Sequence, residues 1–196
     1  YITGFIKFDD EDNLLKVGLK YRNKRLWNDS LMHKSWGIKT SKKERVGGYR
    51  KANLIRLKRK YLLNSHLGYL LADKMGLFSP KSEILYMSMN SQRDGLRLFV
   101  PQVDESFLRE QHLMPTDIYV GKILSAEDML KGDFSQKKTF LNPAFWKKAA
   151  CNNHYPCESM APLEALLNFE DNAPLKMIDV KQFAVLAVYL ELIDAV

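Results

Sequence analysis

Two lysines on one predicted strand are the residues of this chain whose type and position best suit chemistry. Lys34 and Lys39 flank residues 35–38, where Trp36 and Ile38 alternate with smaller residues as in a β-strand. If Trp36 and Ile38 face the core, Lys39 must point to the opposite face of the sheet. A strand lysine held in this way can neutralise nucleotide phosphates. The alternative is that both lysines are ordinary solvent-exposed strand residues.

Several other catalytic signatures are absent from the sequence. It contains no G-x-x-x-x-G-K-[ST] phosphate loop and no G-x-S-x-G nucleophile turn. The four histidines are scattered, and the two cysteines, Cys151 and Cys157, lack the second pair that a zinc site would need. We therefore expect no metal site built by these residues. The two cysteines could form a disulfide in an oxidising compartment or remain free thiols.

The formal net charge is +7, and the positive charge is concentrated between Lys16 and Lys60. Such a basic half suggests a polyanionic partner, with a solvated surface as the alternative. Nucleic acid is not the partner we expect, because few aromatic residues are interleaved with the basic ones as stacking platforms.

The hydrophobic pattern predicts strands grouped around one helix. Expected strands cover Ile2–Phe8, Leu15–Tyr21, Trp36–Thr40, Glu83–Met89 and Leu96–Val100, with Asp94-Gly95 as the turn before the last of them. Residues 57–75 carry apolar residues at helical spacing, and Gly76 is placed to end that helix. The order β-β-β-α-β-β followed by helices indicates an α+β fold with a five-stranded antiparallel sheet and one packed helix.

The remainder of the chain reads as short elements and one long helix. Asp104 is predicted to cap a short helix. Residues 117–120 are predicted to form a short strand, and residues 163–169 a brief helix. Asp179 and Gln182 resemble a capping box that opens a last helix, which is apolar on most sides and should therefore be buried. No stretch reaches the roughly 18 apolar residues of a membrane span.

Several motifs, in the same order, resemble the CotH-type (spore coat protein H-like) family of atypical kinase domains. The similar segments are Lys34–Lys39, Met75-Gly76, Ser79-Pro80-Lys81, Asn90, Gly95–Val100, Gln102-Val103-Asp104 with Phe107-Leu108, and Asp117-Ile118-Tyr119. The resemblance spans roughly residues 15–122 and, more loosely, the last helix.

The resemblance implies a protein-kinase-like fold, with an N-lobe at 1–103 and an incomplete, mostly helical C-lobe portion at 104–196. It also implies ATP with Mg²⁺ or Mn²⁺ as cofactors, a protein substrate, and an extracytoplasmic or cell-surface location. The nucleotide-contacting residues would be Lys39, Lys34, Arg22, Val100, Gln102 and Val103. The catalytic and metal-binding aspartates would follow Val196.

Two departures from the family pattern favour an alternative function. Pro101 stands where the family has its hinge glutamate, and the predicted helix offers no glutamate to pair with Lys39. The alternative is a non-catalytic surface, coat-assembly or binding module on the same fold, because a shared fold does not confer activity.

Overall fold

The computed structural model describes residues 1–7, 14–21, 34–41, 43–57, 63–121, 142–151, 159–167 and 178–194. The chain divides into two units. The first contains Tyr1–Gln102 and Val185–Val196, and the second contains Val103–Ala184.

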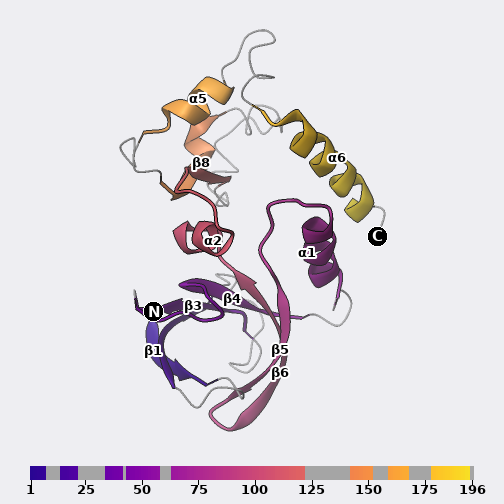
Figure 1. Ribbon diagram of the computed structural model, residues 1–196. Coiled ribbons are helices and arrows are strands. Elements are labelled where there is room, and N and C mark those ends of the chain that lie inside the picture. Colours follow the sequence, from indigo (N-terminus) through magenta and orange to yellow (C-terminus); the bar gives the residue numbers. More distant parts are fainter. Residues whose placement is uncertain are drawn as a thin grey trace, which may run out of the picture. The chain divides into compact units, whose positions relative to one another are not determined.

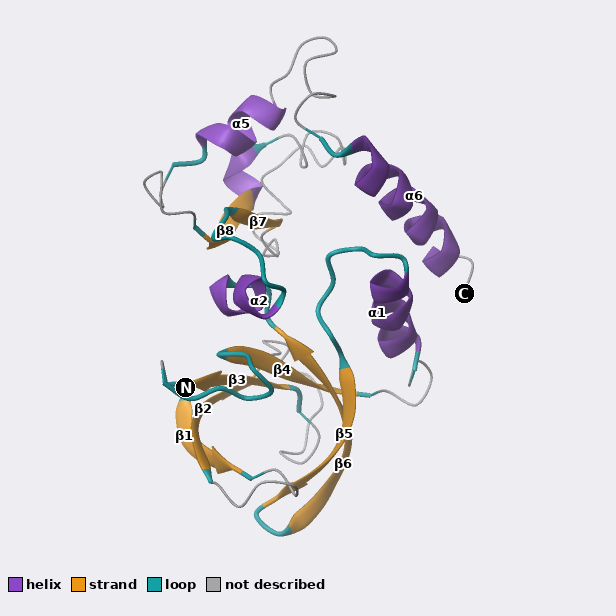
Figure 2. Ribbon diagram, in the orientation of Figure 1, coloured by secondary structure: helices purple, strands orange, loops and turns teal. Residues whose placement is uncertain are grey.

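A curled antiparallel sheet of six strands forms the first unit (Figures 1 and 2). The strands are β1 (Ile2–Ile6), β2 (Leu15–Tyr21), β3 (Trp36–Thr40), β4 (Lys51–Arg56), β5 (Glu83–Met89) and β6 (Gln92–Pro101). Their order in the sheet is β1-β2-β3-β4-β6-β5. The mixed α+β class is therefore confirmed, whereas the expectation of five strands is wrong by one.

The extra strand is β4, which the sequence analysis did not predict and which lies between the predicted strand at residues 36–40 and the predicted helix. Its alternation of Ala52 and Leu54 with polar neighbours is short, and lysines and arginines on both sides obscured it. Ala52 and Leu54 are only 1% and 6% exposed, so burial on one face drives the pairing. From β2 onward the order is then three strands, α1, and two strands.

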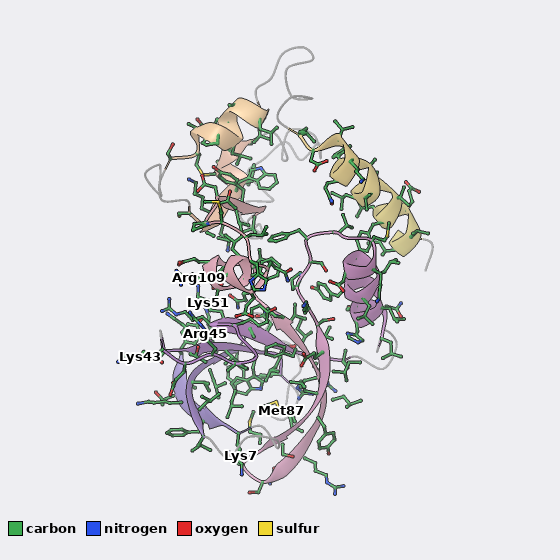
Figure 3. All side chains as sticks on the ribbon, in the orientation of Figure 1. Lys7, Lys43, Arg45, Lys51, Met87 and Arg109 are labelled. Atoms are coloured by element: carbon green, nitrogen blue, oxygen red, sulfur yellow. The ribbon has the colours of Figure 1, made fainter. Side chains whose placement is uncertain are left out.

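The strand pairings divide the sheet into two faces. Val17, Ile38, Leu54 and Phe99 are all buried on one of them. Met87 lies on the same face, and Figure 3 shows it inside the curl, so this is the concave face. The apolar residues that alternate along the strands are thus buried together, because the sheet curls around them.

The hairpin between β5 and β6 turns at Asn90 and Ser91, not at Asp94-Gly95 as the sequence suggested. Asn90 and Ser91 have φ values of 50° and 64°, as a two-residue type I′ turn requires. Asp94 is instead the extra residue in β6 where the register shifts, and Gly95 has a φ of 90°. Gly95 therefore adopts the positive φ of a β-bulge inside the strand, not of the hairpin turn.

Helix α1 (Asn64–Lys74) joins β4 to β5 and ends where Gly76, with φ 71°, was expected to end it. Leu77 N donates to Ala72 O, and Gly76 N donates to Asp73 O, which closes the last turn. Its leucine stripe is not buried, because Leu67 and Leu70 are 52% and 43% exposed. Among the residues of α1 only Ala72 is buried, so the helix is not packed on the sheet through that stripe.

The second unit contains short elements. They are α2 (Glu105–Glu110), β7 (Ile118–Gly121), the 3₁₀ turn η3 (Pro143–Phe145), β8 (Trp146–Ala150) and α5 (Ala161–Leu167). Asp104 caps α2 as expected, because its Oδ1 accepts a hydrogen bond of 2.9 Å from Ser106 N. Phe107 and Leu108 of α2 are almost fully buried.

Helix α6 (Val180–Asp194) is the predicted last helix, and Asp179 Oδ1 accepts from Gln182 N at 3.0 Å as the capping pattern indicated. The expectation that this helix is buried is wrong for most of its surface: Phe183 and Val188 are 61% and 54% exposed. Within the first unit, Tyr189 donates to the carbonyl of Gly68 in α1 at 3.3 Å. Among the described helices, none is both long and apolar enough to cross a membrane.

Ser91→Gly should stabilise the protein, because glycine adopts the left-handed conformation without the steric cost that serine meets there. The free energy of unfolding should rise by about 0.5–1 kcal/mol, measured by thermal denaturation. Ser91→Val should lower it, since a β-branched residue is strained at positive φ. Equal melting temperatures for the two variants would contradict the turn position.

Leu186→Ala should cost less than the ~2–5 kcal/mol of a fully buried leucine, because Leu186 is 39% exposed. Phe107→Ala is the comparison, since Phe107 is 0% exposed and its truncation should cost about 3–5 kcal/mol. Denaturant unfolding of both variants measures the two losses. A larger loss for Leu186→Ala would mean that α6 is buried in the folded protein.

Candidate functional site

The convex face of β1–β4, which we call the lysine face, is the most strongly charged surface that the strand register defines. Side chains alternate between the two faces of each strand, and the register places four lysines on the face away from the core: Lys16, Lys20, Lys39 and Lys51. The other described residues of these strands on this face are uncharged: Thr3, Phe5, Gly18, Gly37, Asn53 and Ile55. The described part of this face therefore carries no carboxylate.

Lys39 and Lys51 lie directly opposite each other on β3 and β4. Both side chains are half-buried. Like charges directly opposite in an antiparallel pair destabilise it. The register therefore concentrates positive charge at this point of the lysine face.

Two of these lysines contact the ring of Tyr1. Its ring lies over Gly18, whose added Cβ would be 3.3 Å from Tyr1 Cβ. Lys20 Nζ and Lys39 Nζ are each 5.8 Å from the ring centroid, within the range of a cation–π contact. Among the described residues, neither ammonium group has a carboxylate within ion-pair distance.

The hairpin that joins β3 to β4 adds further positive charge. Figure 3 shows Lys43, Arg45 and Lys51 at the end of the sheet where β3 passes into β4. Arg45 Nη1 is buried without a hydrogen-bond partner. Thr40 holds the hairpin in place, because its hydroxyl donates to Glu44 O at 2.8 Å.

The predicted hinge residues lie at the end of β6. Val100 is 4% exposed and faces Asn53 of β4. Gln102 reaches the lysine face, since its backbone N donates to Lys51 O at 2.9 Å and its Nε2 to Asn53 Oδ1 at 3.1 Å. Val103 is half-buried and is the first residue of the second unit.

The structure brings Lys39 and Gln102 to the same face but separates them from Lys34. Lys34 Nζ lies 4.7 Å from the ring centroid of Tyr21, which stacks on Trp36 with centroids 4.2 Å apart. Lys34 is therefore on the core side of β3, opposite Lys39. Arg22 lies outside the described residues.

Sequence reasoning missed Lys51 and Asn53 because it missed β4. The signal was present in the alternation of Ala52 and Leu54, which places Lys51 and Asn53 together on the other face.

No cluster of three or more histidines, cysteines, aspartates or glutamates that could hold a metal occurs in the described ranges. The described residues therefore offer no ligand cluster for the metal that the resemblance implies. Cys151 is disulfide-bonded, and the sequence has one other cysteine, Cys157.

In the second unit, the side chains of Asp117, Tyr119 and Lys148 form a polar cluster at the small sheet of β7 and β8. Lys148 Nζ lies 3.0 Å from Asp117 Oδ2, and their side chains are 5% and 9% exposed. Tyr119 OH donates to the same oxygen at 3.2 Å and pairs across the sheet with Lys148. Burial, followed by the hydrogen bond and the charge of Asp117, raises the pKa of Tyr119 to about 12. The cluster joins the two strands.

No protein-family model matches this chain, and no curated protein matches it. The resemblance to CotH-type domains therefore depends on the sequence motifs quoted above, and the function must be argued from the geometry of the lysine face.

The Tyr119 phenol should ionise well above its ordinary pKa of 10.0. Because the folded state holds the proton more tightly, its stabilising contribution is complete below pH 10 and is lost as the pH rises toward about 12. Absorbance titration should show one of the nine tyrosines titrating near pH 12, and Tyr119→Phe should remove that step. Asp117→Asn should lower the pKa of Tyr119. An unchanged alkaline step in Tyr119→Phe would exclude this assignment.

Proposed function

We propose that this chain is a kinase-like domain whose lysine face binds the phosphates of a nucleotide such as ATP. The single observation that carries the proposal is the strand register, which places Lys16, Lys20, Lys39 and Lys51 on one face of β2, β3 and β4. Two compact ammonium groups opposite each other match the several charged oxygens of a polyphosphate. Lys20 and Arg45 extend the positive field around the pair.

The order of elements supports a kinase-like plan. From β2 to β6 the chain has three strands, a helix and two strands, the order expected of a kinase N-lobe. The strand just before the helix is β4, so Lys51 occupies the place in that order where the plan needs a lysine. Lys39 is its cross-strand neighbour. Gln102, at the start of the expected hinge, lies beside them through Asn53.

Each residue has a defined role in this proposal. Lys39 and Lys51 neutralise phosphate oxygens, and Tyr1 holds Lys39 in place through its ring. Gln102 and Asn53 offer amide groups to the polar part of the nucleotide. Transfer of a phosphoryl group to a protein substrate requires carboxylates and a metal, and no such step is derived from these residues.

A non-catalytic binding or assembly module is the second candidate function. Helix α1 contains no glutamate, and its one acidic residue, Asp73, is exposed. The ion pair that holds the phosphate-binding lysine of active kinases is therefore absent from α1. On this alternative the same lysine face would bind an acidic group of an assembly partner without turnover.

Calorimetric titration of the protein with ATP, with and without Mg²⁺, tests the proposal. Lys39→Met and Lys51→Met should each weaken ATP binding by about 10- to 100-fold, since each removes one charge-assisted contact to phosphate. Lys81→Met is the matched control, because Lys81 is exposed and lies outside the strands. Its affinity should equal that of the wild type.

Two results would contradict the nucleotide proposal. If Lys39→Met and Lys51→Met bind ATP as tightly as Lys81→Met, the lysine face is an ordinary solvated surface. If the wild type does not bind ATP but binds an acidic peptide in a Lys39-dependent way, the assembly-module function is correct.

A further inference from the structure

A second group of cations lies on the opposite, concave face of the sheet. Arg56 and Arg97 are directly paired on β4 and β6. Arg56 N donates to Ser35 Oγ at 3.0 Å, just beyond the last paired residues of β3 and β4, and the contact of Lys34 Nζ with the Tyr21 ring places Lys34 on the same side as Arg56. One cation each from β4, from β6 and from the residues just before β3 therefore forms the group Lys34, Arg56 and Arg97.

One described carboxylate, that of Asp94, contacts this group, and Glu83 of β5 lies on the same face, two residues along the strand from the position opposite Arg97. Arg97 is 2% exposed, and its Nη2 lies 2.5 Å from Asp94 Oδ2 while its Nη1 donates to Leu96 O at 3.0 Å. The remaining guanidinium nitrogen of Arg97, Nε, is buried without a hydrogen-bond partner. One aspartate thus neutralises one of the three cations in the group.

A second unpartnered donor belongs to the same face. Trp36 is 6% exposed, and its Nε1 is buried with no hydrogen-bond partner. Tyr21 stacks on the Trp36 ring, and Lys34 lies over Tyr21, so the indole is held in one orientation. Buried polar groups in folded proteins are almost always hydrogen-bonded, so two orphan donors on one face require an explanation.

The strand register fixes how these groups lie on the concave face. Trp36 is level with Phe99, so Arg97 lies two strands across from Trp36, roughly 10 Å, and two residues along the strand, roughly 7 Å. Their side chains project from the concave face, the face on which Met87 is seen inside the curl in Figure 3. Apart from the carboxylates of Asp94 and Glu83, the groups in the set are donors or cations, so the matching ligand supplies acceptor oxygens and negative charge.

We infer that the concave face binds an oxyanion, with Arg97 Nε and Trp36 Nε1 as hydrogen-bond donors and Arg56 and Lys34 as the charges beside them. The shared chemistry is that of a phosphate or a carboxylate group. This site is separate from the lysine face, because its residues lie on the other side of the same strands. It does not depend on the proposed function.

The indole N–H of Trp36 gives a direct readout in ¹H–¹⁵N NMR spectra of the full chain. The sequence has three tryptophans, and Trp36→Phe assigns the signal. Inorganic phosphate and citrate are titrated separately, with sodium chloride at matched ionic strength as the reference. The Trp36 signal should shift saturably with at least one oxyanion. A shift with phosphate identifies the ligand group as a phosphate, and a shift with citrate identifies it as a carboxylate.

Variants at positions outside the buried core keep the test independent of folding: Arg56 is exposed and Lys34 is half-buried. Arg56→Gln and Lys34→Gln should each raise the apparent Kd about tenfold, whereas Arg93→Gln, on an exposed position of β6, should leave it unchanged. Lys39→Met should also leave it unchanged, which distinguishes this site from the lysine face. No shift beyond that in chloride, or equal Kd values for Arg56→Gln and Arg93→Gln, would overturn the inference.

Discussion

The antiparallel pairing of β3 with β4 is the contact on which the rest of this structure depends. It places Trp36 opposite Leu54 on the concave side and Lys39 opposite Lys51 on the convex side. Because side chains alternate across a strand, a shift of one residue would exchange the two sets. The buried residues Ile38, Ala52 and Leu54 fix the register, so the hydrophobic core decides which lysines meet.

The sheet separates two kinds of positive charge. On the convex face the lysines are at least partly exposed, and two of them, Lys20 and Lys39, contact the Tyr1 ring. On the concave face Arg97 is almost fully buried, and burying a guanidinium is costly unless its donors are satisfied. Asp94 reaches Arg97 only because the bulge in β6 inserts an extra residue beside Gly95. A local irregularity in one strand thus supports a buried charge.

The two long helices are less buried than the sheet. In α6 the half-buried residues are Val185, Tyr189 and Ile193, one stripe at intervals of four, and Tyr189 contacts Gly68 of α1. The apolar residues on its other sides are exposed, and so are Leu67 and Leu70 of α1. A helix that is apolar on most sides is usually buried. Here the strands supply most of the buried apolar surface of the first unit.

The sequence alone determined the elements that have strong local signals. The period-2 alternation of residues 15–21 and 36–40, the caps at Asp104 and Asp179, and the helix end at Gly76 are all confirmed, because each depends on residues close together in the chain. It also placed the Lys39 side chain on the face of its strand that points away from the core.

Tertiary structure decided the rest. Strand β4 is defined by its partners β3 and β6, since the basic residues around Ala52 and Leu54 obscured its alternation in the sequence. The Lys39–Lys51 pair and the group Lys34, Arg56 and Arg97 join residues that are far apart in the chain, and only strand pairing brings them together.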